Sequence, residues 1–203
     1  MAIQKQTAAV DTDFLLHLVT TDGLGDDRCE IIAELFEKML VEPIMHGLVH
    51  DYELQKPAQR PTAPDAALAL ELFAAEVVAV KPLEDIVGED PDARDYYKLV
   101  FSELYQDVKK KAPPIDDILT EWTYHESLGE VHSAVMCVFL DCGLFLSDDN
   151  DSRTLKTSVL TKFNFNVTVY DREAACAQAV ALSGGGGRLN RNMRHRLSHK
   201  RTD

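Results

Sequence analysis

The sequence predicts a three-layer α/β/α fold with a mainly parallel central sheet. Short apolar runs that end in acidic residues alternate with longer segments whose apolar residues recur every three or four positions. The first pattern is typical of buried strands, and the second is typical of amphipathic helices. Their alternation favours a parallel sheet with helices on both faces. Functional groups then gather at the carboxyl ends of the strands.

The first half of the chain begins with an apolar run that ends at Asp11, as expected of a buried strand followed by a capped helix. The segment CEIIAELFEKMLVE has helical periodicity, and a proline follows it. The expected elements are a strand ending at Asp11, a helix beginning near Thr12 or Asp13, a helix over 29–42 closed by Pro43, and an apolar segment, 44–54, that carries Glu53 near its end.

The second half is expected to be more helical. The prolines of QKPAQRPTAP indicate a loop, and the glycines of SGGGG indicate a hinge near the C-terminus. We expect residues 1–183 to form one domain that includes a helical insert over about 60–112, and residues 184–203 to form a flexible basic tail. The elements expected here are helices over 64–80, 90–111 and within 116–143, strands over 144–146 and 166–171, and a last helix after 171.

Composition excludes several classes of protein. No stretch approaches the roughly 18 apolar residues of a membrane span, and an acid interrupts the N-terminus before a signal-peptide core could form. The four cysteines show no CxxC pairing, which argues against a zinc site and a disulfide scaffold. These features favour a cytoplasmic protein without a membrane partner.

Acidic side chains follow the predicted strands and could meet at one edge of the sheet. Asp11 ends the first strand, and three acids, Asp148, Asp149 and Asp151, follow the run LFL. Crowded carboxylates repel one another, and a hard cation such as Mg²⁺ or Mn²⁺ relieves that repulsion. A metal held in this way can activate water for attack on a phosphate. The alternative is that these acids are solvated turn residues.

The order of these motifs resembles the PIN-domain ribonucleases, which include toxins of toxin–antitoxin pairs. The segment AAVDTDFLLHLV is similar to the family's opening strand and helix, and SLGEVHSAVMCVFLDCGLFLSDDNDSR is similar to its Gly-Glu helix and late acid pair. The resemblance covers roughly residues 7–55 and 118–175. It implies catalytic residues Asp11, Glu53, Glu130 and Asp149, metal ligands from these four together with Asp148 and Asp151, and supporting roles for Thr12, Asp13, His132 and Arg153.

One departure from the family pattern concerns His132, which stands where many members carry an acid two residues after the glutamate of the Gly-Glu pair. Residues two apart on a helix point in different directions, so Glu130 and His132 cannot easily face one metal. If Glu130 faces the site, the acidic set is complete. If His132 faces it, the metal site is weakened and activity is in doubt.

Two further positions allow two interpretations each. Arg153 could meet a phosphate, or it could form a salt bridge to Asp149 or Asp151. Trp122, with His125, could stack on RNA bases, although a single tryptophan more often has a packing role.

The formal charge of −13 is unevenly distributed. A basic tail could bring RNA to an acidic body through phosphate contacts, or it could bind the chain's own acidic surface or an acidic antitoxin-like partner. A solvated, disordered C-terminus is the remaining alternative. The candidate nucleic-acid-binding residues are Arg188, Arg191, Arg194, Arg196, Lys200 and Arg201.

The sequence therefore predicts a Mg²⁺- or Mn²⁺-dependent endoribonuclease that leaves 5′-phosphate and 3′-hydroxyl ends, as the family resemblance implies. One alternative is a catalytically weakened PIN-like module that binds RNA or a protein partner. Another is a metal-dependent phosphohydrolase of small phosphate esters. A homodimer is expected only by analogy with the family, with the alanine-rich segment 64–80 as a possible apolar face.

Overall fold

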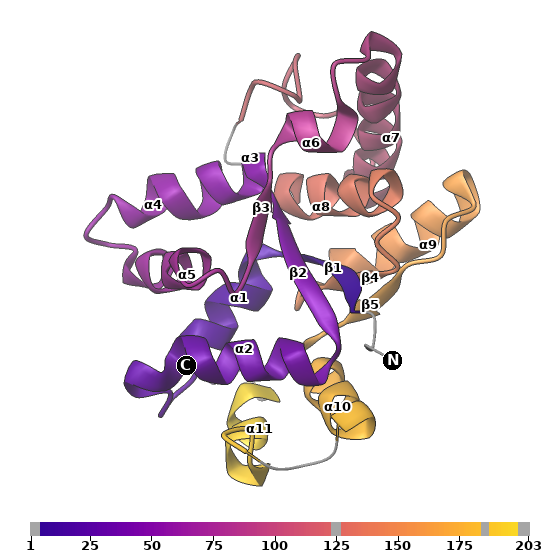
Figure 1. Cartoon of the computed structure of the whole chain (residues 1–203). Coiled ribbons are helices and arrows are strands. Elements are labelled where there is room, and N and C mark those ends of the chain that lie inside the picture. Colours follow the sequence, from indigo (N-terminus) through magenta and orange to yellow (C-terminus); the bar gives the residue numbers. More distant parts are fainter. Residues whose placement is uncertain (1–4, 123–126, 184–186, 199–203) are drawn as a thin grey trace.

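The computed structural model describes residues 5–122, 127–183 and 187–198. Its centre is a five-stranded sheet in which every strand pairs in parallel, in the order β3-β2-β1-β4-β5 (Figure 1). The strands are β1 (Gln6–Val10), β2 (Val41–His46), β3 (Ala79–Lys81), β4 (Leu144–Leu146) and β5 (Thr168–Tyr170).

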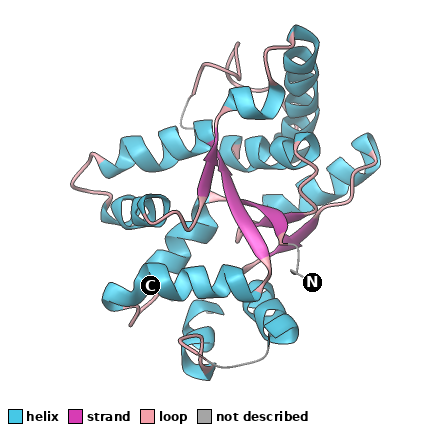
Figure 2. Ribbon diagram, viewed as in Figure 1, coloured by secondary structure: helices cyan, strands magenta, loops and turns pink. Residues whose placement is uncertain are grey.

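Helices cover both faces of the sheet, so the expected three-layer α/β/α architecture is confirmed (Figure 2). Successive residues of β1 alternate between the two hydrophobic cores, since side chains of a strand point to opposite faces. On the Ala8 side lie α1 (Thr12–Val19), α2 (Arg28–Lys38), α5 (Pro64–Ala74), α10 (Arg172–Ser183) and α11 (Arg191–Ser198). On the Ala9 side lie α6 (Leu83–Val87), α7 (Pro91–Lys109), α8 (Leu128–Phe139) and α9 (Asp151–Phe163).

The chain reverses its direction of winding around β1. From β1 it passes to β2 and β3 on one side of the sheet, and it then returns to β4 and β5 on the other side (Figure 1). In open parallel sheets, such a switch point leaves a crevice at the carboxyl ends of the strands. The ends of β1 and β4 are therefore the first place to look for a functional site.

The segment around Pro43 differs from the expectation. Helix α2 ends at Lys38, and Pro43 lies inside β2 instead of closing a helix. Strand β3 pairs with β2 only from Ile44 onward. Pro43 thus precedes the part of β2 that pairs with β3. It lies at an edge of the sheet, where the N–H that proline lacks is not needed for pairing. The expected apolar segment 44–54 is accordingly the end of a strand followed by helical turns.

The expected helical insert also contains a strand. Helix α5 ends at Ala74, earlier than predicted, and Glu76 adopts a left-handed conformation (φ 56°) that turns the chain into β3. The insert of residues 60–112 therefore contributes strand β3 to the sheet, because pairing with β2 overrides the helix propensity of the alanine-rich sequence at this point. Within the alanine-rich segment 64–80, α5 buries Ala69 and Leu72 in the core.

Residues 187–198 pack against the domain, whereas a flexible tail was expected. The predicted hinge lies largely outside the described residues, but residues 191–198 form α11, which packs against α10. Leu189 and Leu197 are buried in the core. These two apolar side chains, rather than the cations around them, explain why a segment expected to be flexible docks on the domain.

Within the described ranges, no helix combines the length and the apolar character needed to cross a membrane.

Candidate metal centre

Asp11 lies at the carboxyl end of β1, at the switch point of the sheet. It caps α1: its Oδ1 accepts a hydrogen bond from the Thr12 amide at 2.8 Å. Its Oδ2 accepts from the hydroxyl of Ser147, at the end of β4, at 3.1 Å. Only 2% of Asp11 is exposed. The two strands that meet at the switch point therefore fix this carboxylate from both sides.

Three more carboxylates converge in front of Asp11. One oxygen from each of Asp13, Glu130 and Asp149 can be chosen so that all three lie within 4.8 Å of one another. Asp13 belongs to the first turn of α1 and Glu130 to the first turn of α8. Three separate elements thus contribute to the group, which we call the acidic triad.

Asp149 is held in place by its own loop. Its Oδ1 accepts a hydrogen bond from the amide of Asp151 at 2.6 Å, and its amide donates to the Ser147 hydroxyl at 3.2 Å. Ser147 therefore contacts both Asp11 and the backbone of Asp149. This buried serine orients two of the acids without adding charge.

Glu53 reaches the site from a π-helical segment, η2 (His50–Gln55), that follows the short helix α3 (Gly47–Val49) and precedes α4 (Lys56–Ala58). Its carboxylate lies directly against α8 at Gly129. A Cβ at Gly129 would be 2.5 Å from Oε1 of Glu53, closer than such atoms can approach. Gly129, the glycine of the Gly-Glu pair, has no side chain and therefore leaves room for the Glu53 carboxylate.

Burial and mutual repulsion make the carboxylates of this region reluctant to ionise. Burial, and then the charges of Glu130, Glu53 and Asp13, raise the pKa of Asp11 well above its ordinary value. Burial raises the pKa of Glu53 to about 7, although the Thr12 hydroxyl lowers it in part.

Glu130 behaves in the same way. Burial is the largest cause that raises its pKa to about 8, and the charges of Glu53, Asp149 and Asp13 add to it. The neighbouring charges that raise these pKa values are all carboxylates. A site of this kind gains from a cation that neutralises it, and an all-oxygen donor set suits Mg²⁺ or Mn²⁺.

Asp148 is not part of this group, contrary to the expectation. Its Oδ2 accepts hydrogen bonds from Arg172 Nε at 2.5 Å and from His17 Nδ1 at 2.8 Å, and its Oδ1 accepts from the Arg172 amide at 3.1 Å. Both Asp148 and Arg172 are 3% exposed at their side chains. Despite the cost of burial, these contacts lower the pKa of Asp148. In this structure Asp148 is therefore paired with Arg172 and His17 and does not belong to the acidic triad.

Asp151 is also engaged elsewhere. Its Oδ2 accepts from Lys109 Nζ at 3.1 Å and from the Ser127 hydroxyl at 2.5 Å. It contributes to the site through its amide, which positions Asp149. Lys109, and not Arg153, is the cation that Asp151 meets; Arg153 lies exposed on α9.

His132 points away from the acids and into the core. Tyr97 Oη lies 2.7 Å from His132 Nδ1 and 3.0 Å from His46 Nε2, and His46 Nδ1 accepts from the Leu48 amide at 3.1 Å. Burial lowers the pKa of both histidines, that of His46 to about 3. Because Glu130 faces the other acids, the acidic set does not depend on His132.

Trp122 packs inside the protein. Its ring stacks on Tyr52, with 5.1 Å between centroids, and on His132, with 5.7 Å. These two ring contacts favour the packing role over base stacking. His125 lies outside the described residues.

The basic tail meets the acidic surface of its own chain. Arg188 pairs with Glu30 and its amide donates to Glu34 Oε2 at 3.0 Å, while Arg196 donates to the backbone carbonyl of Asp22 at 3.3 Å. Arg191 is exposed and Arg194 is partly buried on α11. Lys200 and Arg201 lie outside the described residues. This geometry agrees with the alternative in which the tail binds the body of the protein.

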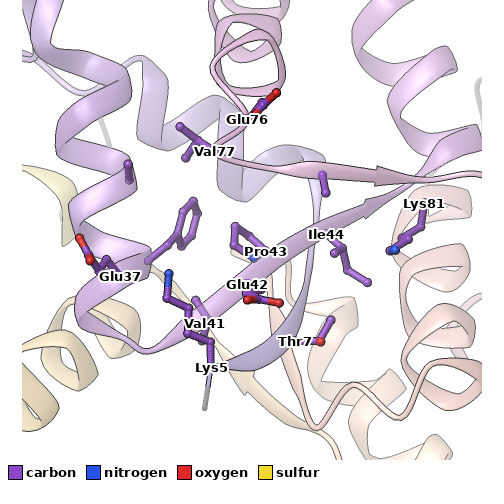
Figure 3. A pocket seen from close by; sticks show the side chains of 13 residues that line it. Lys5, Thr7, Glu37, Val41, Glu42, Pro43, Ile44, Glu76, Val77 and Lys81 are labelled. Atoms are coloured by element: carbon purple, nitrogen blue, oxygen red, sulfur yellow. The ribbon is translucent and has the colours of Figure 1, made fainter. Parts of the chain in front are cut away.

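A cavity of about 570 Å³ lies away from the acids, beside the first half of β2 (Figure 3). Lysine and glutamate side chains mix along its rim, among them Lys5, Lys81, Glu42 and Glu76 (Figure 3). The catalytic chemistry predicted from the sequence does not involve this cavity.

Sequence reasoning underestimated two residues of the site and left out a third. Asp13 was expected only to shape the site, yet it belongs to the acidic triad. Gly129 makes room for Glu53, a role that the Gly-Glu spacing alone does not reveal. Ser147 was not considered, although its position between a predicted strand and the acids was a usable signal.

Comparison with known proteins does not assign the chain to a family. No family model matches the sequence, and neither the curated proteins nor the solved structures include a match.

Proposed function

We propose that this protein is a Mg²⁺- or Mn²⁺-dependent endoribonuclease. The observation that carries the proposal is the acidic triad of Asp13, Glu130 and Asp149, with Asp11 and Glu53 close behind it at the switch point of the sheet. The resemblance of the sequence to PIN-domain ribonucleases adds the nucleic-acid substrate, which the carboxylates alone do not specify.

In this proposal the acidic triad binds the cation directly, and Asp11 and Glu53 complete the negative field around it. The cation would supply a water of lowered pKa and would offset the charge that develops on a phosphate. Ser147 and Thr12 hold Asp11 in place, and the Asp151 amide holds Asp149, so that little reorganisation is needed when a cation binds.

The alternative of a catalytically weakened module rested on His132 as a lost acid. With His132 hydrogen-bonded to Tyr97 in the core and Glu130 facing the acids, that reason for expecting inactivity is removed. We therefore favour the enzyme over the binding module.

Cleavage of end-labelled RNA with Mn²⁺ tests the proposal. Asp149→Asn and Asp11→Asn each remove one charge from the site, and we expect cleavage to fall at least about 100-fold. Asp95→Asn, an exposed change on α7, is the matched control and should cleave like the wild type. A chelator should abolish cleavage by the wild type.

Equal cleavage by wild type and both site variants would indicate a contaminating ribonuclease and would contradict the proposal. Cleavage of small phosphate esters, with no cleavage of several RNAs, would favour the phosphohydrolase instead.

A further inference from the structure

A histidine–carboxylate pair lies beside the acidic triad and has no role in holding the cation. His17 Nδ1 is 2.8 Å from Asp148 Oδ2. The side chain of His17 is 40% exposed, whereas that of Asp148 is 3% exposed. The two ring nitrogens lie on opposite edges of the imidazole, so a ring held by a buried carboxylate through Nδ1 turns its Nε2 edge outward.

Asp148 is itself fixed, which makes the orientation of His17 firm. The buried Arg172 binds Asp148 through Nε and its amide, and its Nη1 reaches the His17 carbonyl at 3.5 Å. The ring of His17 is thus anchored from the end of β4 and from α10. These contacts hold the imidazole of His17 in one orientation.

His17 lies one helical turn from Asp13 of the acidic triad. His17 is four residues after Asp13 on α1, and side chains at that spacing are neighbours on one face, about 6 Å apart at Cβ. The loop after β4 contacts both residues of α1. Its Asp149 lies near Asp13, and the preceding Asp148 binds His17. A phosphate at the triad would place the adjoining sugar within reach of His17.

The chemistry of Nε2 selects one group of that sugar. With Nδ1 donating to the Asp148 carboxylate, Nε2 of a neutral ring is an acceptor, so a phosphate oxygen, which only accepts hydrogen bonds, pairs with Nε2 only when the ring is protonated. A ribose 2′-hydroxyl both donates and accepts, so it satisfies Nε2 in either protonation state. The acidic surroundings also disfavour a second phosphate at this position, whereas a neutral hydroxyl is tolerated.

We infer that His17, oriented by Asp148 and Arg172, binds the ribose 2′-hydroxyl next to the phosphate at the acidic triad. His17 is then a specificity residue that favours RNA over DNA. The inference rests on the proposed function, because it takes the triad as the place where the phosphate binds.

The test compares binding of a fluorescein-labelled RNA 12-mer and the DNA of the same sequence in Ca²⁺. We expect the wild type to prefer RNA, and His17→Ala to lose about five- to tenfold of that preference by weakening RNA binding alone. His195→Ala, a change of an exposed histidine on α11, is the matched control and should keep the preference. Unchanged Mn²⁺ affinity of His17→Ala, measured by calorimetry, shows that the site has kept its structure.

A scan of single 2′-deoxy substitutions in the RNA sharpens the test. One position should weaken binding to the wild type but not to His17→Ala, as expected when a hydroxyl and a side chain act as a pair. An equal effect of every 2′-deoxy substitution on both proteins would overturn the inference.

The remaining outcomes separate the inference from the function on which it rests. If the wild type cleaves RNA with Mn²⁺ but binds RNA and DNA alike, the role of His17 is wrong and the nuclease stands. If the wild type neither binds nor cleaves either oligonucleotide with any divalent cation, both are wrong.

Discussion

Two sets of carboxylates lie at the same edge of the sheet and are treated in opposite ways. Asp148 and Asp151 each meet a cation of the protein, Arg172 and Lys109 respectively. The pKa values of Asp11, Glu53 and Glu130 are instead raised, first by burial and then by the charges of neighbouring carboxylates. We call the first set the compensated acids and the second the uncompensated acids. The first set is neutralised by the protein itself, whereas the second can be neutralised only by protons or by an added cation.

The largest effect on stability is expected when one of the compensated acids loses its charge. Asp148→Asn removes the charge that the buried Arg172 faces, so we expect a loss of about 3 kcal/mol in the free energy of unfolding, because an unpaired buried cation is costly. Urea unfolding of the metal-free protein measures it. Asp149→Asn, one residue away, should cost little or should stabilise the metal-free protein, since it removes repulsion from Glu130.

Equal losses in Asp148→Asn and Asp149→Asn would contradict this division of the acids.

The uncompensated set should reveal itself in the pH dependence of stability. The pKa values of Glu53 and Glu130 are raised to about 7 and about 8, so the folded chain holds protons that the unfolded chain has released. Stability of the metal-free protein therefore falls as pH rises from about 5 to 8, and we expect Tm to fall by at least about 5 °C.

Saturating Mn²⁺ should remove most of that fall, because it replaces the protons. Asp148 contributes with the opposite sign: its pKa is lowered, so its stabilisation is present at neutral pH and is lost in acid. Scanning calorimetry with and without Mn²⁺ measures both, and a metal-free Tm that is independent of pH between 5 and 8 would be evidence against repulsion among these acids.

A smaller effect, on cation binding, is expected from a change at Gly129, where Glu53 contacts α8. Gly129→Ala places a methyl group where the Glu53 carboxylate lies, so Glu53 must move, and we expect about tenfold weaker Mn²⁺ binding by calorimetry. The helix itself gains from alanine, so stability should not fall in parallel. The double variant Gly129→Ala with Glu53→Asp shortens the acid and should recover part of the affinity for Mn²⁺. If neither variant changes the affinity for Mn²⁺, Glu53 does not contribute to the cation site.

The smallest expected effect concerns the exposed ion pairs of the tail. Arg188 is half exposed and its partners Glu30 and Asp27 are more exposed still, so Arg188→Ala should cost less than about 1 kcal/mol. Leu197→Ala, on the same segment, opens a cavity in the core and should cost about 2 kcal/mol or more. A larger loss for Arg188 than for Leu197 in urea unfolding would show that charge, and not apolar burial, docks α11.

Local patterns predicted much of the fold. The strand before Asp11, the run Leu144–Leu146 and the helix that carries Glu130 have strong local signals, and all three are present in the structure. Strands β2 and β3 were missed because a proline and an alanine-rich helix signal concealed them. The pairing of β2 with β1, and of β3 with β2, makes them strands. Long-range pairing is not contained in local propensity.

The site was harder to predict than the fold for a related reason. The sequence indicated which acids gather at the sheet edge, but Asp148 and Asp149 are adjacent in sequence and nothing local says which one meets Arg172, 24 residues away. Asp13 was underrated because its role depends on α8 approaching α1. The sequence did not indicate whether the side chain of His132 faces the acids or the core; its hydrogen bond to Tyr97 shows that it faces the core.

The wide turn of η2 sets a constraint on how this chain can change over evolutionary time. A π-helical segment is equivalent to one residue inserted into an α-helix, and each residue of an α-helix rotates the chain by about 100°. Deleting one residue from 50–55 would restore an ordinary turn and move Glu53 off Gly129. We therefore expect insertions or deletions to be tolerated better at the exposed turn of residues 59–63 than between β2 and Glu53.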